Sequence, residues 1–188
     1  MSDQKTITLA SAGFEAARQV GLLPEGHRCS ALHGHSFTAT VFADLPPDFA
    51  PYPGGEVDVL RERLKDCVSL LDYSYLNETL EHPTDENLAR WICRNVGVPG
   101  VQRVAIQSTG TQGVDLDRNG NAHLWRRFRF QAAHQLPNVP PGHKCGRMHG
   151  HGFEVILHAN QDLGCRNIGI DYDHLEAIWA PFQAQLNF

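Results

Sequence analysis

The chain carries the same motif twice, and this duplication constrains its fold more than any other feature. GHRCSALHGHSF stands at residues 26–37 and GHKCGRMHGHGF at residues 142–153, a separation of 116 residues. Around them, residues 14–44 and 130–160 share 13 identities in 31 positions without a gap. This period is much longer than that of a solenoid repeat. We therefore expect two copies of one structural unit in tandem.

The two copies are expected to differ in length. We assign residues 1–118 to the first unit and residues 119–188 to the second. The second unit lacks counterparts of first-unit residues 73–115, because they would lie beyond position 188. It is therefore predicted to be incomplete while keeping its histidine motif.

Hydrophobic periodicity predicts an α+β fold with an antiparallel sheet. Alternating or β-branched stretches predict strands at residues 5–10, 36–45, 101–109, 123–134 and 150–159. Apolar residues at helical spacing predict helices over residues 57–71, 84–96 and 175–186. Thr84 is the expected N-cap of the second helix, Gly97 ends it, and Asn119–Gly120 is the expected hairpin turn. The first copy then has the order ββααββ.

The second histidine motif predicts a metal site. His149 and His151 are two residues apart on a predicted strand, so they share one face, and His134 ends the preceding strand. If these strands pair antiparallel, three imidazoles converge on one point. Imidazole suits zinc, and three protein ligands leave the fourth position of a tetrahedral Zn2+ open, as in catalytic sites. The alternative is that Cys145 is a fourth ligand, which would give a closed structural site.

The first copy departs from this pattern. Arg18 stands where the second copy has His134. A guanidinium stays protonated and cannot bind a metal. His33, His35 and Cys29 persist, so they form a possible second but degenerate site.

The stretch FQAAHQLPNVPPGHKCGRMHGHGF resembles the signature of the 6-pyruvoyltetrahydropterin synthase / 6-carboxytetrahydropterin synthase family, in particular its queuosine-pathway branch. Further family-like segments are EVDVL (56–60), LLDYSYLN (70–77), HPTDENLA (82–89) and GIDYDHL (169–175). The resemblance covers both copies. It implies a tandem T-fold, ββααββ units whose antiparallel sheets form a barrel on oligomerisation.

The same resemblance implies an activity and its residues. His134, His149 and His151 would hold Zn2+, and Cys145 would be catalytic. The implied substrate is 7,8-dihydroneopterin triphosphate, and in the queuosine branch the product is a 6-carboxytetrahydropterin. A cysteine beside a dication can be held as a thiolate and serve as a base. The family's oligomers imply a homo-oligomer here.

Two family positions are altered. Where the family has an Asp-His pair, the first copy has Asp72–Tyr73 and the second has Asn187–Phe188. Gln107 stands where the family has a pterin-binding glutamate. Asp72, Tyr73 and Gln107 are therefore possible substrate-binding residues, and one hypothesis is that they line the second copy's zinc pocket. A 6-pyruvoyltetrahydropterin synthase and a non-catalytic zinc- and pterin-binding or assembly subunit remain alternatives.

Composition excludes several other classes. The formal net charge is −5 without a basic cluster, which gives no electrostatic support for nucleic-acid binding. No apolar run approaches the roughly 20 residues that span a bilayer. The N-terminal residues lack the apolar core of a signal peptide, and five cysteines without a CxxC motif are typical of reduced thiols. We therefore expect a cytoplasmic protein without membrane or nucleic-acid partners.

Overall fold

A computed structural model of the chain describes residues 6–21, 23, 26–161 and 169–187. Within them, seven strands form one sheet in the order β3-β1-β2-β4-β5-β6-β7, accompanied by three α-helices. The strands are β1 (Thr8–Arg18), β2 (His33–Ala43), β3 (Ser74–Tyr75), β4 (Val101–Thr109), β5 (Gln112–Asp117), β6 (Ala122–His134) and β7 (His149–Gln161). The helices are α1 (Glu56–Ser69), α2 (Asp85–Asn95) and α3 (Tyr172–Leu186), and short 3-10 turns are η1 (Arg28–Ser30), η2 (Leu76–Glu78) and η3 (Lys144–Gly146).

The predicted α+β class, the antiparallel sheet and the ββααββ order of the first copy are confirmed. Neighbouring strands pair antiparallel, except that the short β3 runs parallel to β1. β1 continues to Arg18, well past the predicted end at residue 10. The alternation of exposed and buried positions persists there through small residues such as Ala12 and Ala16, which hydrophobic patterning does not reveal.

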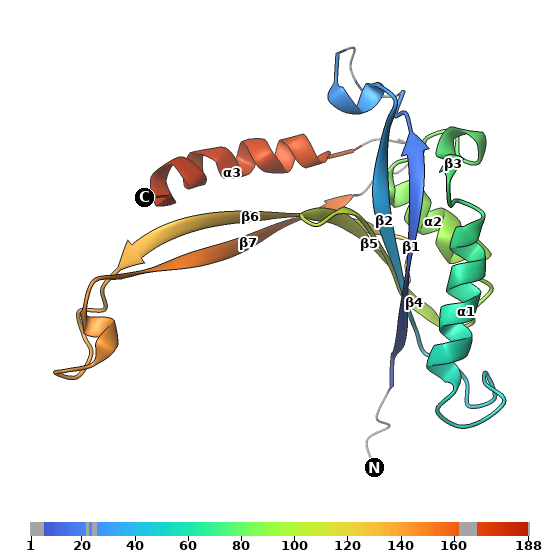
Figure 1. Cartoon of the computed structure of the whole chain (residues 1–188), viewed down its shortest axis with the longest axis horizontal. Helices are drawn as coiled ribbons and strands as arrows, with labels where there is room; N and C mark the ends of the chain where they lie inside the picture. The colour runs from blue at the N-terminus through green and yellow to red at the C-terminus, as the bar shows by residue number, and fades with distance from the viewer. Residues whose placement is uncertain (1–5, 22, 24–25, 162–168, 188) are drawn as a thin grey trace.

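The main core lies between the first part of the sheet and two helices. α1 and α2 cover one face of β1, β2 and β4 (Figure 1). Leu60, Leu64 and Ile92 are fully buried on the helices against this face. The Thr84 side chain accepts a hydrogen bond from the Asn87 amide, which confirms the predicted N-cap of α2.

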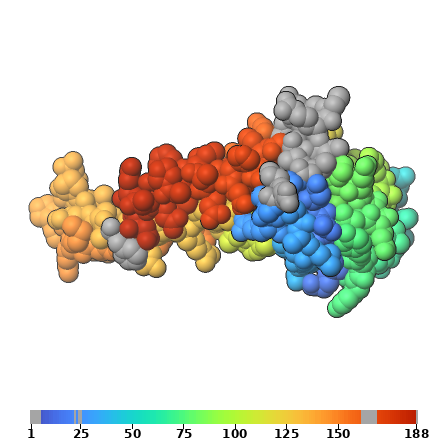
Figure 2. Space-filling model, turned by 90° about the horizontal axis from the view of Figure 1, so that it is seen from above, coloured from blue at the N-terminus to red at the C-terminus, as the bar shows by residue number. Residues whose placement is uncertain are grey.

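The last two strands form an arm that projects from this body (Figures 1 and 2). β6 and β7 pair over their full length, and α3 lies along one side of the arm. Trp179 of α3 is 5% exposed and stacks on Phe128 of β6. This contact gives the arm a small apolar core of its own.

Local contacts recur in the two halves at the spacing of the sequence repeat. The Val20 amide donates to the Cys29 carbonyl at 3.0 Å, and the Leu136 amide donates to the Cys145 carbonyl at 2.9 Å. Both members of the second pair lie 116 residues beyond those of the first. These contacts support the interpretation of the chain as a duplication.

A second recurring contact joins the first strand of each half to the residues that follow α1 and α3. The Glu15 amide donates to Asp72 Oδ1 at 2.8 Å, and the Gln131 amide donates to Asn187 Oδ1 at 3.0 Å. Asn187 therefore occupies the place of Asp72, although it lies 115 residues later and so one position short of the 116-residue offset of the repeat. Phe188, the expected counterpart of Tyr73, lies outside the described residues.

The proposed boundary between the units falls in the turn between β5 and β6. Gly120 in this turn has a φ of 85°, which confirms the predicted hairpin. Because β5 pairs with β6, the sheet continues across the boundary, and the division into residues 1–118 and 119–188 stays a prediction. No helix in the described part of the chain is long and apolar enough to cross a membrane.

Candidate metal centre and its first-copy counterpart

Three histidines meet where β6 ends and β7 begins. His134 pairs in register with His149, and His151 pairs with Ala132 two positions further along. Alternation along a strand places all three side chains on one face. One ligand nitrogen from each ring lies within 4.8 Å of the other two. The structure thus brings together the three imidazoles that the sequence predicts.

The ring orientations fit a metal ion. The Nε2 atoms of His134 and His149 are 3.2 Å apart. Two nitrogens bound tetrahedrally at about 2.0–2.1 Å from zinc would be about 3.3 Å apart. The Nδ1 atom of His149 is 2.7 Å from the Arg147 carbonyl oxygen, which can only accept, so Nδ1 carries the proton and Nε2 keeps its lone pair.

Cys145 lies beside this cluster in sequence but is not a member of it. The only group of metal-type ligands found among the described residues is His134, His149 and His151. Cys145 sits in the turn η3, half-buried, and its amide donates to His143 Nδ1 at 3.2 Å. A closed site with Cys145 as fourth ligand therefore gains no support from the geometry.

In the first copy the corresponding place holds a buried ion pair. Arg18 pairs in register with His33, as His134 does with His149. The Arg18 guanidinium donates to Asp85 Oδ1 at 2.6 Å and to the Pro83 carbonyl at 3.0 Å. The side chains of Arg18 and Asp85 are 6% and 1% exposed. The positive charge at this place is therefore the guanidinium of Arg18 rather than a metal ion.

Asp85 is the centre of a satisfied hydrogen-bond network. Its Oδ2 accepts from Ser108 Oγ at 2.7 Å and from the Tyr172 hydroxyl at 2.6 Å. Burial alone would raise the pKa of Asp85, but the charge of Arg18 and these hydrogen bonds hold that pKa below its ordinary value. Tyr172 begins α3, so the network joins the two halves of the chain.

The remaining first-copy residues lie around this pair. His33 Nδ1 is 2.8 Å from the Ala31 carbonyl oxygen, which repeats the arrangement of His149. Burial and, second to it, the charge of Arg18 lower the pKa of His35 to about 4. Burial raises the pKa of the Cys29 thiol, against the opposing effect of Arg18. The shifts of His35 and Cys29 both favour the neutral form beside the fixed guanidinium.

A cavity of about 470 Å³ opens between this pair and the start of α3. Its walls include Arg18, His33 and His35 from the first half, and Arg126 and Tyr172 from the second. The cavity therefore lies between the two halves of the chain.

Two comparisons identify the family. The model of the family described as 6-pyruvoyl tetrahydropterin synthase matches residues 7–118 and again residues 123–188. The chain belongs to this family. A 6-carboxy-5,6,7,8-tetrahydropterin synthase from Synechocystis sp. is 39% identical over 112 residues, which cover 52% of this chain and 82% of that protein. The resemblance read from the histidine motif is confirmed.

Solved structures of the family show weaker similarity. The Caenorhabditis elegans 6-pyruvoyl tetrahydropterin synthase is 18% identical, with a TM-score of 0.45 over 56% of this chain and 89% of the other. A catalytic-residue mutant of the Plasmodium vivax enzyme is 14% identical, with a TM-score of 0.44 over 62% of this chain and 99% of the other. The family assignment rests on the sequence matches.

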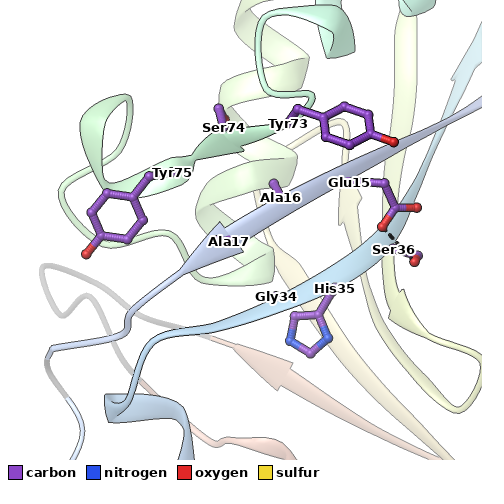
Figure 3. A pocket seen from close by; sticks show the side chains of 9 residues that line it. All are labelled: Glu15, Ala16, Ala17, Gly34, His35, Ser36, Tyr73, Ser74 and Tyr75. Atoms are coloured by element: carbon purple, nitrogen blue, oxygen red, sulfur yellow. Dashed lines mark hydrogen bonds between the residues drawn. The ribbon is translucent and has the colours of Figure 1, made fainter.

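The residues at the altered family positions lie away from the histidine cluster. Tyr73 is 88% exposed, has a φ of 50°, and borders an open groove of about 530 Å³ with Glu15, Ser36 and Tyr75 (Figure 3). Within one chain β3 and the cluster at the end of β6 are at opposite ends of the molecule (Figure 1). The same chain does not bring Tyr73 to its own histidine cluster.

Asp72 and Gln107 have structural surroundings of their own. Asp72 holds the Glu15 amide, as described above. Gln107 lies on β4 between Thr38 of β2 and Gly113 of β5, half-buried between two buried neighbours in sequence. Neither residue meets the cluster of His134 within the chain. If they serve that site, they must come from a second copy.

Sequence analysis missed Asp85 and Tyr172. Both carry the first-copy network, yet they lie 67 and 154 positions after Arg18 in the chain. One signal was present. An arginine at a position that points into a core requires a buried anion nearby, and Asp85 directly follows the predicted N-cap Thr84.

Proposed function

We propose that the chain is a zinc-dependent 6-carboxy-5,6,7,8-tetrahydropterin synthase-like enzyme acting on 7,8-dihydroneopterin triphosphate in queuosine (7-deazaguanine) biosynthesis. The convergence of His134, His149 and His151 is the observation that carries the proposal. The 39% identity to a 6-carboxytetrahydropterin synthase supports the choice of reaction. The proposed activity is that of a carbon–carbon and carbon–oxygen lyase.

The residues present fit a catalytic zinc ion. His134 and His149 present Nε2 atoms at the spacing of tetrahedral ligands, and His151 completes the set. Zinc bound there would polarise a substrate hydroxyl or carbonyl oxygen and acidify the adjacent C–H bond. The Arg147 carbonyl fixes the ring of His149 by accepting from Nδ1, and so orients a ligand before any ion arrives.

Cys145 is proposed as the base that removes the acidified proton. The turn η3 holds its backbone in place through the His143 ring and the Leu136 amide. Lys144 and Arg147 flank it, and both side chains are exposed. Two cations beside the base are suited to attract a triphosphate.

A homo-oligomer is part of the proposal. Tyr73 and Asp72 directly precede β3, and Gln107 lies on β4. Figure 1 shows both strands in the body of the molecule, away from the far end of β6, so a second copy would have to supply these residues as walls of the site. Replacing Gln107 or Asp72 should then weaken pterin binding. Unchanged binding in both variants would remove these residues from the site. We also propose that the protein is cytoplasmic.

The experiment compares turnover of 7,8-dihydroneopterin triphosphate by the zinc-loaded wild type and the Cys145→Ala variant. Zinc content is measured in the same samples. We expect loss of turnover with unchanged zinc, and we expect the control Cys93→Ala, which removes a half-buried thiol on α2, to retain turnover. Full turnover by Cys145→Ala would exclude Cys145 as the base. Loss of zinc would instead favour the closed structural site.

A non-catalytic zinc- and pterin-binding or assembly subunit is the second candidate. The observation that favours it is the altered Asp-His pair, because Tyr73 and Phe188 stand in the sequence where the family has histidine and offer no imidazole for proton transfer. This candidate predicts zinc and pterin binding without product in the wild type. Product analysis also separates the 6-carboxy product from the 6-pyruvoyl product of the other family branch.

A further inference from the structure

Three residues that line the cavity beside Arg18 carry a buried polar atom without a hydrogen-bond partner, and one of these atoms, His27 Nε2, lies 3.1 Å from Asp173 Oδ2. The other two atoms belong to Arg18 and His33. Arg18 Nε and His33 Nε2 make no hydrogen bond to any described group. The two residues lie directly opposite each other on β1 and β2, and both line the cavity. Leaving a buried polar group unpaired is energetically costly, so such atoms are seldom left without a ligand or water.

These two atoms have complementary roles. The Nε atom of a guanidinium can only donate. His33 holds its proton on Nδ1, which faces the Ala31 carbonyl, so in the neutral ring Nε2 can only accept. A hydroxyl group satisfies both, because its oxygen accepts from Arg18 while its proton is donated to His33.

The charges around the cavity argue against a phosphorylated ligand. Arg18 is held by Asp85, and Arg28 pairs with Asp173. Arg126 donates to Glu176 at 2.9 Å. Each of these cations already has an anionic partner. A ligand without phosphate therefore fits this cavity better than a triphosphate.

We propose that the first-copy cavity is a metal-independent binding site for an uncharged, hydroxyl-bearing pterin, in which the Arg18 guanidinium takes the place of the ion. The pterin part of this proposal rests on the proposed function. The cavity of about 470 Å³ is within the range of small-molecule sites. The Arg18–Asp85 pair fixes the donor in advance, so binding needs no metal.

The test measures binding of neopterin, a fluorescent pterin with a hydroxylated side chain, to the full-length protein in excess EDTA. We expect the zinc-free wild type to bind neopterin and His33→Ala to bind it about tenfold more weakly, the loss expected for one buried hydrogen bond. His149→Ala, the matched change in the second copy, should bind like the wild type. His33→Ala is the chosen variant because replacing Arg18 would leave Asp85 buried and unpaired.

Three results would overturn the proposal. They are absence of binding by the folded zinc-free wild type, equal binding by wild type and His33→Ala, and equal weakening by His149→Ala. Each result would mean that only water binds Arg18 Nε and His33 Nε2, or that the pterin binds at another site. Failure of turnover with intact neopterin binding would count against the proposed function alone. Competition by 7,8-dihydroneopterin triphosphate should be weaker than by neopterin itself.

Discussion

Arg18 and Asp85 form a buried ion pair at 2.6 Å in the place where the second copy carries a histidine of its metal cluster. The two residues come from β1 and the first turn of α2. Removing one partner of a buried pair leaves an uncompensated charge, whereas removing both leaves none. An arginine at position 18, where the second copy has His134, therefore requires the carboxylate of Asp85 on α2.

Asp85→Ala should lower the free energy of unfolding by about 3–5 kcal/mol, because Arg18 would stay buried without an anion. Urea denaturation followed by circular dichroism measures this. The control is Glu154→Ala, which breaks solvent-accessible ion pairs with Arg129 and Arg127 and should cost no more than about 1 kcal/mol. Similar losses in the two variants would contradict the importance given to the buried pair.

Tyr172→Phe should lower the free energy of unfolding by about 1.5–3 kcal/mol, the range for a hydrogen bond to a charged group. The variant removes the hydroxyl that donates to Asp85 at 2.6 Å and keeps the ring. In the Asp85→Ala background the same change should cost much less, since its acceptor is gone. Equal losses in both backgrounds would show that the hydroxyl does not act through Asp85.

Acid should weaken the fold through His35. Burial lowers the folded-state pKa of His35 to about 4, with Arg18 and His33 acting in the same direction and Asp85 opposing them. The unfolded chain takes up this proton near the ordinary pKa of about 6.5. Stability should therefore fall as the pH drops from about 6.5 to about 4, since the unfolded state binds more protons there.

The His35→Gln variant isolates this effect. Its free energy of unfolding should change less with pH across the same window than that of the wild type, while above pH 7 the two pH profiles run parallel. Asp85, whose pKa is lowered, contributes its own loss only at more acidic pH, below its ordinary value. An identical slope in both proteins between pH 6.5 and 4 would show that His35 is not the group responsible.

Arg18→His should create a second metal site. It completes the set with His33 and His35 that His134, His149 and His151 form in the other half. Zinc would then supply the positive charge beside Asp85. Zinc content should rise from about one to about two ions per chain. A folded variant that keeps the wild-type zinc content would show that more than one residue separates the two sites.

The sequence predicts local features well. Alternation along β6 and β7 places His134, His149 and His151 on one face, and the structure brings them together. Thr84 and Gly120 mark a helix start and a turn through their own chemistry. These features depend on residues that are neighbours in the chain or on adjoining strands.

Distant contacts were not predicted in the same way. Asp85 reaches Arg18, and Tyr172 reaches Asp85, only through the packing of α2 and α3, and no spacing in the sequence encodes these contacts. The position of Tyr73 is a second example. Within one chain Tyr73 lies on an open groove (Figure 3), so its proposed place in a zinc pocket requires a second copy and stays a prediction.

Zinc content per chain in the wild type, His149→Ala and His33→Ala is the most direct test of the central claim. After zinc loading and dialysis we expect about one ion per chain in the wild type, about one in His33→Ala, and almost none in His149→Ala. Wild-type protein without zinc, or zinc that survives in His149→Ala, would contradict the account.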